Sequence, residues 1–165
     1  MDCKDKIIIL IRHGEKIFDD YTDLSITGIA RAECLPKLFS STGIKYIPTK
    51  LYANNRSKKS TRPYDTLIPL SKALNLEIEE FKKSNVQEVI DFVENKLTKD
   101  EHNVILISSS HKVIPYLSTL LGHEVDASKG NDKFFIWKNG KFLIEGKQSD
   151  YIGKDIDEWL KNHKK

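Results

Sequence analysis

The sequence has few cysteines, no long apolar run and no large excess of charge of either sign. Two cysteines among 165 residues, Cys3 and Cys34, in a chain long enough to build a sizeable core, indicate free thiols in a reducing compartment rather than a structural disulfide. The longest apolar run covers residues 7–11, far short of the ~20 residues that a membrane-spanning helix needs. The N-terminus has no signal-peptide pattern and no lipid-attachment motif occurs. These absences predict a cytoplasmic protein with no membrane partner.

Charges of the two signs nearly balance. Lys and Arg number 27 and Asp and Glu 24, which leaves a formal net charge of +3. An excess this small and dispersed argues against nucleic acid as a partner, whereas mild basicity favours anionic small molecules. The hydrophobic share of 39% and the charged share of 31% are typical of a globular chain and exclude disordered and fibrous classes. The length fits a single domain over residues 1–165.

Strand and helix patterns alternate along the chain. Continuous apolar runs at residues 7–11 and 104–107 predict strands buried on both faces of a parallel sheet. Further short strands are predicted at residues 49–53 and 76–78, and a β-hairpin with an Asn-Gly turn at residues 134–144. Helices are predicted at residues 25–38, 61–74, 84–97, 112–121 and 155–162. The fold class is therefore α/β, a three-layer sandwich with a mostly parallel central sheet, helices on both faces, a minimal cap and a C-terminal hairpin.

Local signals refine two of these helices. Pro36 predicts a kink or an early end in the helix at residues 25–38, whose apolar stripe includes Ile29 and Leu35. Ser84 and Gln87 have the spacing of a capping box and predict the start of the helix at residues 84–97, with Val86 on its buried face.

The residues that follow the buried strands carry the candidate chemistry. In open α/β sheets, ligands bind beyond the carboxyl ends of the strands. Residues 12–16 (Arg-His-Gly-Glu-Lys) follow the first strand, the loop at residues 54–62 follows the second, and His111 follows the strand at residues 104–107. A neutral imidazole can attack phosphorus, guanidinium groups match phosphoryl oxygens, and Gly14 lets backbone amides approach an oxyanion. These residue types fit phosphoryl transfer without a metal.

The motif at residues 12–14 (Arg-His-Gly), directly after a buried strand, resembles that of the histidine phosphatase superfamily, which has the phosphoglycerate mutase-like fold. Residues 24–28 (Leu-Ser-Ile-Thr-Gly) are similar to its Leu-Ser/Thr-x-x-Gly segment. Residues 62–66 (Arg-Pro-Tyr-Asp-Thr) are similar to its Arg-x-x-x-Thr segment, especially as seen in small fungal members. Residues 107–111 (Ile-Ser-Ser-Ser-His) resemble the strand that ends in its second histidine. The matches have the order and spacing of the superfamily and span residues 6–122.

This resemblance implies a role for each matched residue. His13 would be the nucleophile that accepts the phosphoryl group, and His111 would be the second catalytic histidine. Arg12, Arg62 and Gly14 would bind the phosphoryl group of the substrate. The implied activity is hydrolysis of phosphomonoesters through a phosphohistidine, without metal or cofactor, on a phosphorylated small molecule or a phosphoprotein.

The proton donor stays open at this stage. Active members of the superfamily usually take an acidic donor from the segment between the second arginine and the second histidine, which is short here. Glu88 lies in that segment, with Glu77, Glu79 and Glu80, while Glu15 and Asp19 lie near His13 in sequence. Lys112 stands where the superfamily often has a glycine and alters the rim of the pocket. The alternative function is therefore a catalytically weak or inactive member that binds phosphorylated ligands or protein partners.

Several competing interpretations are weaker. Arg56 lies in the same loop as Arg62, but only Arg62 has the spacing to Thr66. Mutase activity is less favoured, because it needs an enclosed site that a short chain can hardly build. Cysteine-based phosphatase and P-loop chemistry are excluded, because no arginine lies at the required spacing from either cysteine and no P-loop motif occurs. The remaining histidines, His102, His123 and His163, are interpreted as loop or terminal residues.

Overall fold

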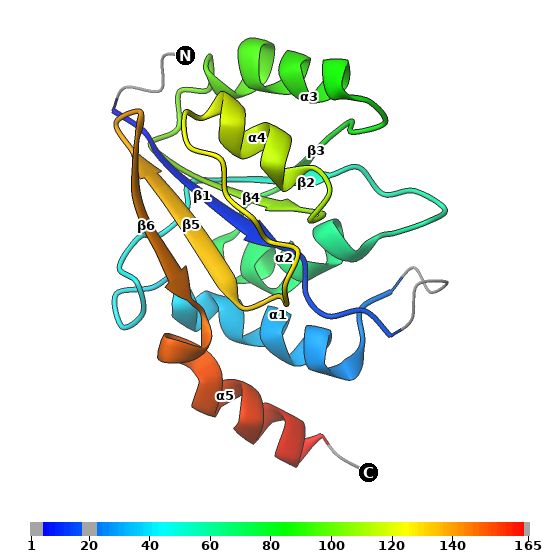
Figure 1. The fold of residues 1–165 in the computed structure, drawn as a ribbon. Coiled ribbons are helices and arrows are strands. Elements are labelled where there is room, and N and C mark those ends of the chain that lie inside the picture. Colours follow the sequence, from blue (N-terminus) through cyan, green and yellow to red (C-terminus); the bar gives the residue numbers. More distant parts are fainter. Residues whose placement is uncertain (1–4, 18–22, 164–165) are drawn as a thin grey trace.

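The computed structural model describes residues 5–17 and 23–163, so Cys3 and Asp19 lie outside the described residues. Its strands are β1 (Ile7–Arg12), β2 (Lys50–Asn54), β3 (Ile78–Phe81), β4 (Val104–Ser109), β5 (Lys133–Lys138) and β6 (Lys141–Lys147). They form one sheet in the order β3-β2-β4-β1-β5-β6 (Figure 1). The first four strands in this order are parallel, and β5 and β6 add an antiparallel hairpin. The predicted mostly parallel sheet and C-terminal hairpin are confirmed.

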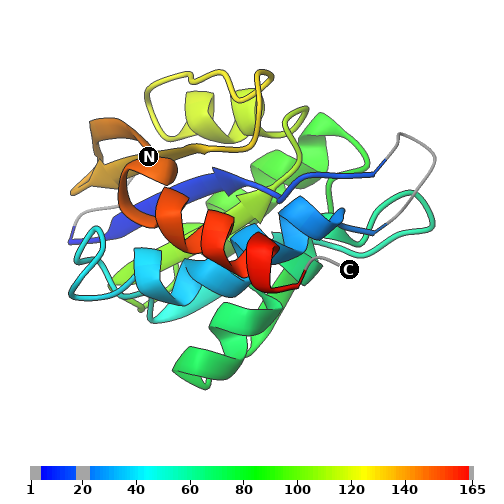
Figure 2. The same cartoon turned by 90° about the horizontal axis from the view of Figure 1, so that it is seen from below.

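Helices cover both faces of this sheet, as Figures 1 and 2 show. They are α1 (Ile26–Leu38), α2 (Arg62–Leu74), α3 (Val86–Phe92), the π-helical turn η1 (Val93–Leu97), α4 (Ile114–Leu120) and α5 (Ser149–Asn162). Because side chains alternate along a strand, Ile8 and Leu10 of β1 pack with α3, η1 and α4, whereas Ile9 and Ile11 pack with α1, α2 and α5. The predicted three-layer α/β sandwich is confirmed. No helix in the described ranges has the length and apolarity to cross a membrane.

Helix α1 begins where the sequence predicts and ends two residues beyond its proline. Ser25 is the N-cap, and its side chain accepts a hydrogen bond from the Gly28 amide at 3.1 Å. Pro36 lies in the last turn, and the helix still reaches Leu38, so it does not end early. Ile29 is 39% exposed, which corrects its predicted place in the buried stripe. It lies about 200° around the helix from Arg31, which is on the buried side.

Several other predicted boundaries are shifted. The N-cap of α3 is Asn85, whose side chain accepts from the Glu88 amide at 2.9 Å, while the Glu88 carboxylate accepts from the Ser84 amide at 2.7 Å. The capping pair therefore lies one residue later than predicted, because asparagine caps as well as serine, and Val86 is exposed.

Two further elements begin at different residues. β3 starts at Ile78, because Asn75 ends α2 in the left-handed conformation and residues 76–77 form the connection. α5 starts at Ser149 rather than at residue 155, because Asp132 accepts hydrogen bonds from both the amide and the hydroxyl of Ser149.

Candidate active site

The structure brings Arg12, His13, Arg62 and His111 together at the carboxyl ends of the parallel strands. Arg12 is the last residue of β1 and pairs in register with Ser109, the last residue of β4, just before the loop that carries His111. Arg62 is the first residue of α2. Because β1, β4 and β2 are parallel neighbours, their carboxyl ends lie at one edge of the sheet (Figure 1).

Thr66 joins the His13 segment to the start of α2. Its hydroxyl accepts a hydrogen bond from the Gly14 amide at 2.9 Å and donates to the Arg62 carbonyl at 2.7 Å. One side chain thus fixes the backbone beside His13 and the backbone of Arg62. The Arg-x-x-x-Thr spacing seen in the sequence corresponds to this contact.

Two glycines allow the His13 segment to pack against α1. A Cβ atom on Gly14 would lie 2.9 Å from the Gly28 carbonyl oxygen, and one on Gly28 would lie 2.3 Å from the Glu15 carbonyl oxygen. Both distances are too short for real Cβ atoms, so glycine is required on each side. The Gly14 amide already donates its hydrogen bond to Thr66. Glycine at this position therefore allows the backbone to pack closely.

His13 is almost fully buried, with 3% of its surface exposed. Its Nδ1 lies 2.7 Å from the Gly14 carbonyl oxygen. Because a carbonyl can only accept, Nδ1 carries the proton and the lone pair of the neutral ring is on Nε2. Burial, joined by the charges of Arg62, Arg12 and His111, lowers the pKa of His13 to about 4, against the opposing hydrogen bond to Gly14. His13 is therefore neutral near pH 7 with Nε2 available as a nucleophile.

Positively charged side chains surround His13, since Arg62 and Arg12 both act on its ring. Arg12 Nη1 donates to the carbonyl oxygens of Ala127 and Gly130, each at 3.1 Å. Burial and the neighbouring Arg62 lower the pKa of Arg12, while Glu15 opposes this change. Burial, Arg12, Lys112 and Lys16 likewise lower the pKa of His111, opposed by Asp126. These neighbouring cations make the pocket attractive to an anion.

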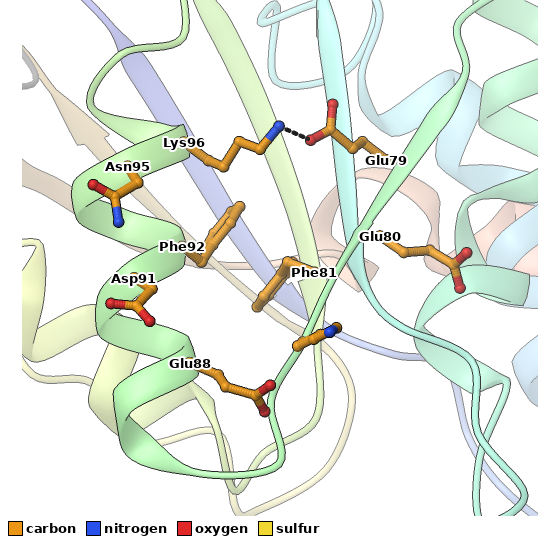
Figure 3. A pocket seen from close by; sticks show the side chains of 9 residues that line it. Glu79, Glu80, Phe81, Glu88, Asp91, Phe92, Asn95 and Lys96 are labelled. Carbon is orange, nitrogen blue, oxygen red and sulfur yellow. Dashed lines mark ion pairs between the residues drawn. The ribbon is translucent and has the colours of Figure 1, made fainter.

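Four of the five described acidic candidates for proton donor are engaged in other contacts, and the fifth, Glu77, is exposed in the connection between α2 and β3. Both carboxylate oxygens of Glu15 accept from Arg31, at 2.9 Å each. Glu88 caps α3 and lines a groove of about 440 Å³ between β3 and α3 (Figure 3). Glu79 pairs with Lys50 and Lys96, and Glu80 pairs with Arg56. Asp19 lies outside the described residues.

Two grooves on the surface lie away from the four site residues. The groove in Figure 3 has Phe81 and Phe92 stacked at 3.9 Å between ring centroids, and Lys96 reaches across it to Glu79 at 3.4 Å. The second groove, of about 320 Å³, is apolar and lies under the hairpin, with Phe134 and Tyr151 in its lining. Arg12, His13, Arg62 and His111 line neither of them.

The structure separates Arg56 from Arg62. Arg56 is exposed, pairs with Glu80 at 3.0 Å and lies over the Tyr64 ring at 3.9 Å, whereas Arg62 is buried and lowers the pKa of His13.

The remaining histidines lie elsewhere. His102 bonds to Asp100, His123 stacks on Phe142, and His163 stacks on Trp159. Within residues 5–17 and 23–163, no three His, Cys, Asp or Glu side chains lie together as a metal site would require.

Two polar groups beside the site were missed by the sequence analysis. Asn54, fully buried at the end of β2, accepts hydrogen bonds from the Ser110 amide at 2.8 Å and the Ser109 hydroxyl at 3.2 Å, and so holds the loop that carries His111. Its place at the end of a buried strand was a usable signal. Arg31, which holds Glu15, had no such signal, because it lies inside a helix whose pattern predicts ordinary packing.

Comparison with known proteins finds chains of similar structure but none of similar sequence. No protein-family model matches the chain, and no curated protein is similar to it. The protein histidine phosphatase SixA complexed with tungstate superimposes with a TM-score of 0.63 at 16% identity, over 87% of this chain and 98% of that one. Phosphoglycerate mutase from Bacillus anthracis str. Sterne gives 0.60 at 13% identity, over 91% and 97% of the two chains. A mycobacterial glucosyl-3-phosphoglycerate phosphatase gives 0.55 at 12% identity, over 84% and 96%.

These likenesses establish the fold of the chain. It is the phosphoglycerate mutase-like fold of the histidine phosphatases, and the resemblance that the sequence motifs indicated is confirmed at that level. The activity is a separate question, since one fold supports several reactions.

Proposed function

We propose that this protein is a phosphatase that hydrolyses phosphomonoesters through a phosphohistidine on His13. The observation that carries the proposal is a buried imidazole with its proton on Nδ1, a pKa of about 4, and the cations Arg12 and Arg62 beside it. Structures that share the fold include phosphatases by name. The substrate would be a phosphorylated small molecule or a phosphoprotein, met in the cytoplasm.

The proposed reaction has two steps. His13 Nε2 attacks the phosphorus, the bond from phosphorus to the ester oxygen breaks, and that oxygen leaves with a proton taken from solvent water. Water then attacks the phosphohistidine, the nitrogen–phosphorus bond breaks, and inorganic phosphate leaves the neutral imidazole behind. Arg12, Arg62 and His111 stabilise the charge on the phosphoryl oxygens in both steps. No metal or cofactor enters either step.

A second function is favoured by the state of the acidic side chains. Because Arg31 holds both oxygens of Glu15 and Glu88 caps α3, neither is free to protonate a leaving group. General acid catalysis contributes about 10²- to 10⁴-fold, so its loss would leave phosphate binding intact and turnover slow. The protein would then be a weak or inactive member that binds phosphorylated ligands or partners.

Hydrolysis of p-nitrophenyl phosphate between pH 4 and pH 7, with EDTA throughout, separates the two functions. The phosphatase proposal expects turnover by the wild type, its loss in His13→Ala, and its retention in Arg56→Ala, a matched change of a nearby exposed side chain. Rapid quenching should trap an acid-labile phosphate on the wild type alone. Equal turnover in wild type and His13→Ala would refute the mechanism. Vanadate binding without turnover on a broad substrate panel would support the second function.

A further inference from the structure

We infer that Arg31 is a positioning residue for the His13 nucleophile, an inference that rests on the proposed function. Arg31 lies on α1 with 9% of its side chain exposed. Its Nε and Nη2 donate to the two oxygens of Glu15, each at 2.9 Å. Its Nη1 donates to Asp132 at 2.9 Å and to Gln148 at 3.0 Å. One guanidinium thus joins three segments that meet behind His13.

The first connection to His13 runs along the chain through Glu15. The Glu15 side chain is held in a bidentate pair by Arg31, and its carbonyl oxygen accepts from the Ser25 amide at 2.8 Å. A bidentate pair fixes both the distance and the plane of the carboxylate. The chain two residues after His13 is therefore fixed at backbone and side chain, as Thr66 fixes it at Gly14.

The second connection runs through space to the His13 carbonyl. Gln148 is fully buried, accepts from Arg31, and donates to the Lys133 carbonyl at 3.2 Å and the Asn131 carbonyl at 3.4 Å. Asn131 then donates through Nδ2 to the His13 carbonyl oxygen at 2.8 Å. Arg31 thus acts on the nucleophile from two directions.

The charge of Arg31 excludes a role in holding the substrate. Burial alone would lower its pKa, but hydrogen bonds and charges from Glu15 and Asp132 outweigh burial and raise it. A guanidinium that is already paired with two carboxylates has little attraction left for a phosphoryl group. Its effect should therefore appear in the rate of phosphoryl transfer and hardly at all in ground-state binding.

The chain offers a matched control for this effect. Lys37 also lies on α1, and its ammonium pairs with Asp155 of α5 at 3.0 Å. Lys37→Met therefore removes a cation that connects α1 to the C-terminal region through Asp155, which lies on α5 and does not contact the His13 segment in the described part of the chain. Arg31→Met removes the connection behind the nucleophile.

Steady-state kinetics of these variants tests the inference. Since small displacements of a reacting group cost up to about 10²-fold in rate, we expect Arg31→Met to lower kcat by about 10- to 100-fold with KM within about twofold of wild type. Lys37→Met should leave both unchanged. Asn131→Ala, which removes only the contact to the His13 carbonyl, should lower kcat in the same direction and keeps the test available if Arg31→Met does not fold. The double variant should lose less than the product of the two single effects, because both act on His13.

A second measurement keeps this test independent of turnover. The ¹⁵N resonances of the His13 ring report the proton on Nδ1 in any folded variant. They should shift in Arg31→Met and Asn131→Ala and stay in place in Lys37→Met. A wild type without turnover would refute the proposed function, and the ring resonances would still decide whether Arg31 positions His13. An unchanged kcat together with unchanged ring resonances in Arg31→Met and Asn131→Ala would overturn the inference.

Discussion

Arg31 and Arg12 both lie near the His13 segment, but different groups interact with their positive charges. Arg31, behind the nucleophile, pairs with Glu15 and Asp132, and its pKa is raised. Arg12, in the pocket, donates to backbone carbonyls, and burial together with Arg62 lowers its pKa. Two carboxylates balance the positive charge of Arg31, whereas the hydrogen-bond partners of Arg12 are neutral carbonyl groups.

The difference separates positioning from binding. A buried cation with two carboxylates gains little from a ligand, and breaking its contacts disturbs the geometry around it. Cations that lie close enough for one to lower the pKa of the other, as Arg62 does for Arg12, carry an unfavourable energy that an incoming phosphoryl group relieves. The same histidine is therefore held by one cluster and made reactive toward anions by the other.

The largest expected effect comes from weakening the pocket. Arg62→Gln removes a buried cation beside His13, and we expect kcat/KM to fall by about 10³-fold, or about 4 kcal/mol of transition-state stabilisation. Vanadate binding measured by calorimetry should weaken in parallel. Arg56→Gln, from the exposed end of the same loop, should change neither quantity. If Arg56→Gln were as damaging as Arg62→Gln, the assignment of the binding arginine would be wrong.

A smaller effect is expected on stability as a function of pH. The pKa of His13 is about 4 in the folded protein against 6.5 ordinarily. Between these values the unfolded chain binds a proton that the folded chain does not, so the free energy of unfolding falls as the pH falls. For His13 alone the loss is roughly 3 kcal/mol. The lowered pKa of His111 acts in the same direction.

Urea unfolding at pH 7 and at pH 4.5 measures most of this loss, roughly 2 kcal/mol. His13→Asn should lose less stability than the wild type over this interval. The contributions of acidic groups with lowered pKa values, Asp100, Glu79 and Glu80, are present in both proteins and cancel in the difference. Equal losses in both proteins would mean that His13 is not held neutral by its surroundings.

The sheet could be predicted from the sequence because its central strands are buried on both faces. β1 and β4 are nearly unbroken apolar runs, and the polar residues that follow each run mark the end where ligands bind. Peripheral elements were less predictable, since their limits depend on contacts distant in sequence. α5, for example, begins early because Asp132 caps it at Ser149.

The candidate site likewise has one part that could be predicted from the sequence and one part that could not. The four site residues end a strand, follow a strand or begin a helix within recognisable motifs, so their convergence could be predicted; they are Arg12, His13, Arg62 and His111. The cluster behind His13 could not, because Arg31 meets Asp132 and Gln148 across 101 and 117 residues of sequence. Neither Asp132 nor Gln148 lies in a local sequence pattern that predicts a buried contact.

The smallest predicted effect concerns Gly28, which lies where the two clusters touch. A Cβ at this position would lie 2.3 Å from the Glu15 carbonyl oxygen, so Gly28→Ala must displace the segment that Arg31 and Gly14 hold. We expect a loss of about 1–3 kcal/mol in the free energy of unfolding, measured by urea denaturation, with a fall in kcat.

Gly153 of α5 supplies the matched control for Gly28. Its Cβ would meet only the Ser149 side chain, at 3.3 Å. This tight contact offsets the gain of about 0.5–1 kcal/mol from helix propensity, so Gly153→Ala should be close to neutral. A loss at Gly28 with little change at Gly153 would show that Gly28 is required by contact with the His13 segment. No loss at Gly28 would mean that this segment can move away from α1 without cost, and that the two clusters are not rigidly joined.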